Sequence, residues 1–250
     1  MADLPPREAL DAYILRFIQD KRHSEGVDVL PEYADDFLTL YGLIQRVRRL
    51  AQSYLRLRKQ GFSSEGQILV RAAMEHAVTA QYAFLTPSGI ARLHVTLGRA
   101  HKNYAVVLAE SSTKPEIHEW AARIEAPDGS SLPPFSGEGM MGQLDSIKFL
   151  KTTYKVLSQV GHVSHESQFD AFVEDDGRYH LTTEPQPSFT HEVLYALVGF
   201  CLLSDWVLAR LEGNEAELHL IRQLGGQLRL PWRLDTHLTA EKRRFPNEIE

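Results

Sequence analysis

Apolar residues recur every three or four positions through most of this chain, and that spacing is typical of amphipathic helices. Pro31 and Pro115 stand near the start of two such stretches, where proline suits the first turn of a helix. Gly61 and Gly213 stand where two of the stretches end. The pattern predicts helices over residues 5–21, 31–60, 67–85, 90–111, 115–126, 144–162, 188–211 and 215–225.

Two stretches depart from the helical pattern. Residues 127–142 (PDGSSLPPFSGEGMMG) are rich in glycine, proline and serine, and we expect them to form a loop. They contain a formal G-x-G-x-x-G, but no predicted strand precedes it, so the context of a dinucleotide-binding motif is absent. In residues 169–184, apolar and polar positions alternate around an Asp-Gly pair. This pattern predicts a small hairpin or irregular insertion near residues 166–185.

Together these elements predict an all-α protein, built as a single helical bundle of about seven helices. The chain has 250 residues, of which 43% are hydrophobic, enough for one large core. The expected organisation is an N-terminal helix and loop over 1–30, the bundle over 31–226, and a C-terminal tail over 227–250. The tail is expected to be partly extended and to end unfolded.

Composition and charge narrow the classes of function that this chain can have. The net charge of −6 gives no basic excess for holding a long nucleic-acid duplex. The single cysteine, Cys201, excludes an intrachain disulfide framework, and its apolar neighbours predict an inert core position. The N-terminus does not resemble a signal peptide, and no run reaches about 18 apolar residues. We expect a cytoplasmic protein with no membrane partner and no cofactor, with a possible homodimer face on the apolar stretch Val193–Leu211.

The stretch Gln67–Leu85 (QILVRAAMEHAVTAQYAFL) is apolar almost all the way round, which predicts a helix enclosed by other helices. It nevertheless carries Arg71, Glu75 and His76. Arg71 and Glu75 are four residues apart and share one face. Because an unpaired charge is costly to remove from water, these groups need partners nearby.

The expected partners lie on the helix that ends near Gly161. Tyr154, Ser158 and His162 follow one another at steps of four, so they form one stripe, and His165 comes three residues later. We expect this stripe to meet the helix at 67–85 within hydrogen-bond distance, about 2.7–3.2 Å. The predicted binding cluster consists of Arg71, Glu75, Tyr82, Tyr154, Ser158, His162 and His165.

This cluster has several possible roles. It could fix the register of two helices, or it could bind a small ligand or another protein. His162 and His165 with Glu75 and His76 could supply metal ligands, but Arg71 would repel a cation, so no metal is predicted. Ser158 has no G-x-S-x-G around it, which argues against a nucleophile of the hydrolase type.

Two segments, RAAMEHAVTAQYAF and YKVLSQVGHVSH, resemble an all-helical prokaryotic domain of unknown function, DUF5677-like. The shared features are an R-x-x-x-E helix and a later helix that ends in Tyr, Ser and His. The resemblance covers roughly Phe37 to Leu211. It implies a helical bundle and no established activity.

The segment from Arg71 to His76 reads R-x-x-x-x-H, which is similar to the signature of HEPN-type helical proteins, many of them RNA-cleaving toxins or defence proteins. This resemblance implies a metal-independent ribonuclease that pairs two motifs across a dimer. Arg71 would stabilise the charge on the phosphorane, and His76 would act as general acid or base. Five residues span about 500° of helical rotation, however, which separates the two side chains around the helix. A binding or regulatory protein is therefore the first hypothesis, and a ribonuclease acting on RNA is the alternative.

Overall fold

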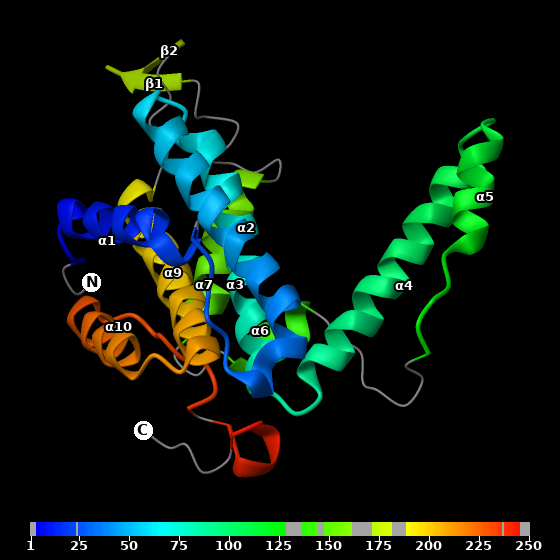
Figure 1. Cartoon of the computed structure of the whole chain (residues 1–250). Helices are drawn as coiled ribbons and strands as arrows, with labels where there is room; N and C mark the ends of the chain where they lie inside the picture. The colour runs from blue at the N-terminus through cyan, green and yellow to red at the C-terminus, as the bar shows by residue number, and fades with distance from the viewer. Residues whose placement is uncertain are drawn as a thin grey trace.

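The computed structural model describes residues 4–23, 25–128, 137–144, 148–161, 172–181, 189–236 and 238–245. Over these residues the protein is a helical bundle with one two-stranded sheet, so the predicted all-α fold is confirmed (Figure 1). The helices are α1 (Arg7–Gln19), α2 (Ala34–Lys59), α3 (Ser63–Leu85), α4 (Gly89–Glu110), α5 (Pro115–Arg123), α6 (Gly137–Leu144), α7 (Phe149–Gly161), α9 (Thr190–Glu212) and α10 (Glu215–Leu228). Short 3-10 turns lie at Lys21–His23, Pro31–Tyr33 and Ala240–Lys242.

Helix α3 lies at the centre of the bundle, as its apolar sequence predicts. It packs against α2 along most of its length and also contacts α4, α6, α7 and α9. Every residue from Ala80 to Leu85 is buried. The helix begins at Ser63 without a side-chain cap and follows a turn in which Gly61 has a φ of +87°, a value that favours glycine.

Helix α9 is the second interior helix, and every residue from Ala196 to Ala209 is buried. It contacts α1, α2, α3, α7 and α10. Among the described residues it alone is long and apolar enough to cross a membrane, but most of that stretch is covered by the rest of the molecule. The expectation that Val193–Leu211 offers a homodimer face is wrong, because its apolar side chains already pack inside one chain.

Helices α4 and α5 form an arm that projects away from the other helices (Figure 1). Only the first turns of α4 are buried against the bundle, through Ile90 and Leu93. Farther out the arm has its own small core of Ala105, Ala109 and Ala121. Helix α4 therefore stands largely free of the main core.

The segment predicted to be a loop at 127–142 contains α6, so that part of the expectation is wrong. Met140 and Leu144 of α6 are buried in the main core, and α6 packs on α3. Burial of these side chains stabilises a helix that its glycine-rich sequence disfavours.

The predicted hairpin is present. Strands β1 (Phe172–Asp175) and β2 (Arg178–Leu181) pair antiparallel, with Phe172 opposite Leu181. Asp176 and Gly177 both have positive φ in the turn, as an Asp-Gly hairpin requires.

The segment after α10 is irregular, with several bends and the 3-10 turn Ala240–Lys242, and it packs onto the bundle. Leu230, Leu234 and Leu238 are buried in the main core. The amide of Arg244 donates to the carbonyl of Leu85 over 2.7 Å and so holds the segment against the end of α3. The predicted boundary near residue 227 therefore does not separate the following residues from the bundle core.

Candidate functional site

Arg71 on α3 and Tyr154 on α7 are in direct contact, as the spacing of their helices predicts. Nη2 of Arg71 donates to the Tyr154 hydroxyl over 3.1 Å. The guanidinium carbon lies 4.9 Å from the centre of the tyrosine ring, within the range of a cation–π contact. These two contacts hold the arginine against α7 rather than out in solvent.

Glu75 is the carboxylate of this site, and it is exposed. Its Oε1 lies 3.5 Å from Nε of Arg71, and 59% of its side chain is accessible, against 20% for Arg71. The expectation that Glu75 is enclosed is wrong, because the neighbouring helices leave this part of α3 uncovered. Glu75 is therefore available to a molecule arriving from solvent.

Tyr82 does not belong with Arg71 and Glu75. Its hydroxyl accepts from Nη2 of Arg92 over 2.8 Å and donates to Oε1 of Gln143 over 3.0 Å. Tyr82 follows Arg71 by 11 residues, which places it three turns, or about 16 Å, farther along the helix. Its hydroxyl joins α3 to α4 and α6 instead of meeting the predicted stripe on α7.

The rest of the predicted stripe is only partly described. Ser158 lies one turn beyond Tyr154 on α7, and its buried Oγ has no hydrogen-bond partner among the residues that the structure describes. His162 and His165 lie outside the described residues. Their predicted place in the cluster stays a prediction.

A cavity of about 380 Å³ lies between α3, α6 and α7. A volume of this size is typical of a small-molecule site. Its lining combines apolar walls with a carboxylate and two hydroxyls: Met74, Glu75, Val78, Thr79, Met140, Met141 and Tyr154. Three of the four methionines in the chain are in this lining. These methionines were not among the predicted site residues, although the Met140-Met141 pair in a glycine-rich stretch was a visible signal.

His76 lies on a different side of α3. Burial lowers the pKa of its imidazole below 6.5, and Arg46 on α2 lowers it further, while Glu75 raises it. Arg71, in contrast, contacts α7. Among the described residues, neither His76 nor Arg71 lines the cavity, so the structure does not bring these two side chains into one site.

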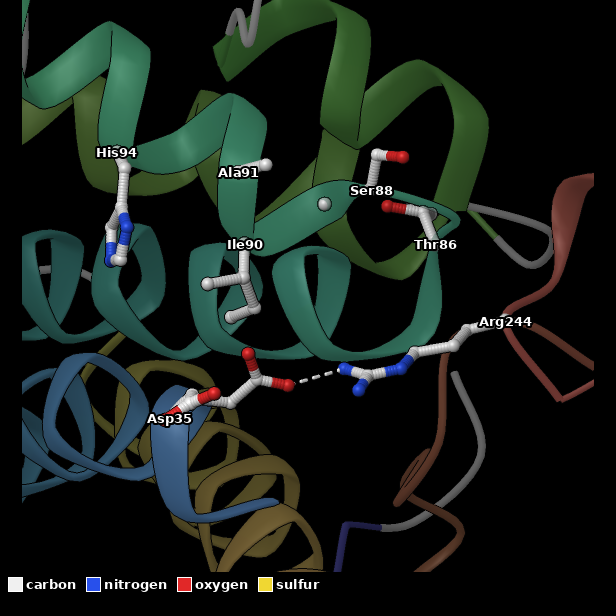
Figure 2. Close-up of a pocket in the computed structure, with 9 residues that line it drawn as sticks. Asp35, Thr86, Ser88, Ile90, Ala91, His94 and Arg244 are labelled. Carbon is white, nitrogen blue, oxygen red and sulfur yellow. Dashed lines mark hydrogen bonds and ion pairs between the residues drawn. The ribbon is translucent and has the colours of Figure 1, made fainter. Parts of the chain in front are cut away.

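A second cavity, of about 420 Å³, lies where α2 and α4 begin and the C-terminal segment returns. Figure 2 shows Arg244 reaching toward the acidic residues at the start of α2. Its Nη1 donates to Oδ2 of Asp36 over 2.7 Å, and the hydroxyl of Thr86 donates to the carbonyl of Tyr82 over 2.6 Å. His94 Nε2 lies 2.7 Å from Oγ1 of Thr39. Because Arg244, Thr86 and His94 already have partners within the chain, we interpret this cavity as a junction that anchors the C-terminal segment.

A further ionic cluster lies around Asp205 of α9, whose side chain is 1% exposed. Asp205 accepts a hydrogen bond from the hydroxyl of Tyr13 over 3.2 Å and pairs with Arg22. Arg22 also donates to Asp20 and to Glu212. The sequence signal was a lone carboxylate inside the apolar run of α9, the same kind of signal that drew attention to α3.

Among the described side chains, the charges of this cluster do not balance. Arg16 joins it through Glu217, so two guanidinium groups face four carboxylates, those of Asp20, Asp205, Glu212 and Glu217. Burial raises the pKa of Asp205 to about 6, opposed by Arg22 and Arg16 and reinforced by Glu217 and Asp20. The cluster ties α1 and the following turn to α9 and α10, which is a structural role.

The described residues include no group of three or more His, Cys, Asp or Glu side chains arranged to hold a metal ion. Cys201 is fully buried, and burial raises the pKa of its thiol well above the usual value, consistent with an inert core position. Comparison with known protein families, with curated proteins and with solved structures finds no match to this chain.

Proposed function

We propose that this protein binds a small amphipathic molecule with a cationic head in the cavity between α3, α6 and α7. The observation that carries the proposal is the exposed carboxylate of Glu75 among the methionine-rich walls of that cavity. Such a site favours an apolar body with a positive group at one end. The role would be carriage or sensing of the ligand rather than chemistry on it.

The apolar part of the ligand would lie against Met74, Met140 and Met141. Methionine side chains are unbranched and flexible, so they adapt to chains of different shape. Met74 and Met140 are nearly fully buried and Met141 is partly buried, which keeps the walls apolar. Removal of a CH₂ group from water contributes about 0.8 kcal/mol, so a chain of several carbons supplies most of the affinity.

The cationic head would meet Glu75, which is the one charged residue among the described residues that line the cavity. Arg71 is close, but its guanidinium is already engaged by Tyr154 and Glu75 and is less exposed than the carboxylate. The hydroxyls of Thr79 and Tyr154 can accept hydrogen bonds from an ammonium group.

The test is isothermal titration calorimetry with n-octylamine, n-octanol and octanoate, which share one chain length and differ in charge. We expect octylamine to bind about fivefold more tightly than octanol, the effect of roughly 1 kcal/mol from a partly exposed carboxylate. Glu75→Gln should remove that preference. Glu65→Gln is the matched control, since Glu65 is an exposed glutamate on the same helix outside the cavity lining.

Octanoate binding more tightly than octylamine would make Arg71 the partner of the head group and would overturn the assignment. Absence of binding by all three probes, or an equal loss of preference in Glu75→Gln and Glu65→Gln, would overturn the site itself.

The contacts of α3 offer no support to the ribonuclease alternative. Arg71 faces α7 and His76 lies near Arg46 of α2, and neither lines the cavity. We therefore expect purified protein to leave RNA intact in the presence of EDTA. Cleavage of RNA by the wild type that disappears in both Arg71→Ala and His76→Ala would instead support the ribonuclease alternative.

A further inference from the structure

The projecting arm carries an apolar stripe that the chain's described residues leave mostly exposed. Leu97, Tyr104 and Val107 of α4 are 51%, 62% and 60% exposed. Ala100, between them, is also exposed. Large apolar side chains in a row on one helix face are typical of a protein–protein contact.

The spacing of this stripe is that of a coiled-coil seam. Positions 97, 100, 104 and 107 follow one another by three, four and three residues, as a and d positions of a heptad do. The same face begins with Ile90 and Leu93, which are buried against the bundle. Helix α4 therefore uses one apolar face throughout, with its first part covered by its own chain and its outer part open.

Helix α5 touches the stripe only at its edge, where the ring of Trp120 lies edge-on to that of Tyr104 with 6.5 Å between the ring centroids. It packs on the side of α4 that presents Ala105 and Ala109, where Ala121 completes the small core. The amine of Lys102 donates to the carbonyl of Ala121 over 2.8 Å on that side. The arm is thus a helical hairpin with one face closed by α5 and another face left open.

We propose that the stripe pairs with the stripe of a second copy of this chain, with the two α4 helices antiparallel. A two-fold axis beside residue 102 places Leu97 opposite the partner's Val107 and Ala100 opposite the partner's Tyr104. The small side chain of Ala100 then meets the large side chain of the partner's Tyr104. Each a position faces a d position of the other helix, as in antiparallel coiled coils. A two-fold contact of this kind uses the same patch on both copies.

The distribution of charge along the arm favours the same orientation. Residues 89–102, at the base, contain three basic side chains and no acidic one: Arg92, Arg99 and Lys102. Residues 103–119, at the tip, contain three acidic side chains and one basic one: Glu110, Glu116, Glu119 and Lys114. An antiparallel pair brings each acidic tip beside a basic base, whereas a parallel pair would bring like charges together.

The first test is the molar mass in solution, measured by sedimentation equilibrium. The wild-type chain should be a dimer, and Val107→Glu should be a monomer with an unchanged circular-dichroism spectrum. Val106→Glu is the matched control, since Val106 is the neighbouring valine, is 39% exposed and points away from the stripe. It should remain dimeric. A monomeric wild type, or a Val107→Glu chain that stays dimeric, would overturn the proposal.

Orientation is tested by disulfide cross-linking. A mixture of Leu97→Cys chains and Val107→Cys chains should form a mixed disulfide dimer, because these positions face each other in the antiparallel pair. The native Cys201 is fully buried and does not compete. Cross-linking of Leu97→Cys chains mainly with one another would instead indicate a parallel pair and contradict the inference. Octylamine binding should be unchanged in Val107→Glu, which keeps this result separate from that of the cavity.

Discussion

Glu75 and Asp205 are both carboxylates next to arginines, and their exposure to water gives them different roles. Glu75 is more than half exposed and 3.5 Å from Arg71, which makes it a weak partner for the arginine and an accessible one for a ligand. Asp205 is 1% exposed and fixed by Tyr13 and Arg22, so it holds the chain together. The sequence placed charges on both α3 and α9. It could not show which charge reaches water, because that depends on where neighbouring helices stop.

Removing Glu75 should therefore change stability little. We expect Glu75→Ala to alter the free energy of unfolding by about 0–1 kcal/mol, because an ion pair with an exposed partner contributes no more than that. Urea denaturation followed by circular dichroism measures the change. A loss near 3 kcal/mol would show that the carboxylate neutralises a buried cation after all.

The raised pKa of Asp205 predicts a pH dependence. Between its ordinary value of 3.8 and the folded value of about 6, the folded chain keeps a proton that the unfolded chain has released. The stability that Asp205 contributes therefore falls as the pH rises from about 4 to about 6, and it is constant above that range. The measurement is the free energy of unfolding of wild type minus that of Asp205→Asn at each pH. The difference should decrease across this interval. An increase would mean that folding lowers the pKa of Asp205 instead of raising it.

At the scale of elements, continuous apolar sequence identified α3 and α9 as interior helices, because a helix without a polar face must be enclosed. The Asp-Gly turn identified the hairpin through its backbone preference. Helix α6 could not be predicted in this way, since its glycines disfavour a helix and the burial of Met140 and Leu144 against α3 stabilises it. Two of the seven residues that line the cavity, Met140 and Met141, come from α6, so the cavity as a whole was not predictable either.

The turn after α1 is held by Arg22, which contacts Asp20, Asp205 and Glu212. We expect Arg22→Met to lower the free energy of unfolding by about 3–5 kcal/mol at pH 7, because the buried Asp205 and three partly buried carboxylates would then share the guanidinium of Arg16. Much of that loss should be recovered near pH 5, where the carboxylates with raised pKa values take up protons. Thermal unfolding at the two pH values tests this. An equal loss at both would rule out the electrostatic cause.

At the scale of the whole molecule, the described chain is one bundle core with one projecting arm. The C-terminal segment is part of that core, since Leu230, Leu234 and Leu238 pack in it and Arg244 reaches both Leu85 and Asp36. Its sequence is short of helical periodicity, so the pattern alone indicated a separate tail. The leucines at every fourth position from 230 to 238 are the signal that was available.

The packing of the C-terminal segment should contribute measurably to the free energy of unfolding. Leu234 is 5% exposed, and Leu234→Ala should lower the free energy of unfolding by about 2–4 kcal/mol, the usual effect of removing a buried leucine side chain. Leu38→Ala is a suitable control, because Leu38 is 79% exposed and should change stability by less than about 0.5 kcal/mol. Equal stability of the two variants would show that the segment is detached in solution.

The proposed binding site can be observed directly through methionine methyl groups, since Met74, Met140 and Met141 line the cavity and Met1 is the only other methionine in the chain. In a ¹³C-methyl-methionine NMR titration with octylamine, we expect three methyl signals to shift together along one binding curve. The fourth signal should stay in place, and Glu75→Gln should weaken the curve. Octylamine that leaves all three cavity methyl signals unmoved at saturating concentration would contradict the account.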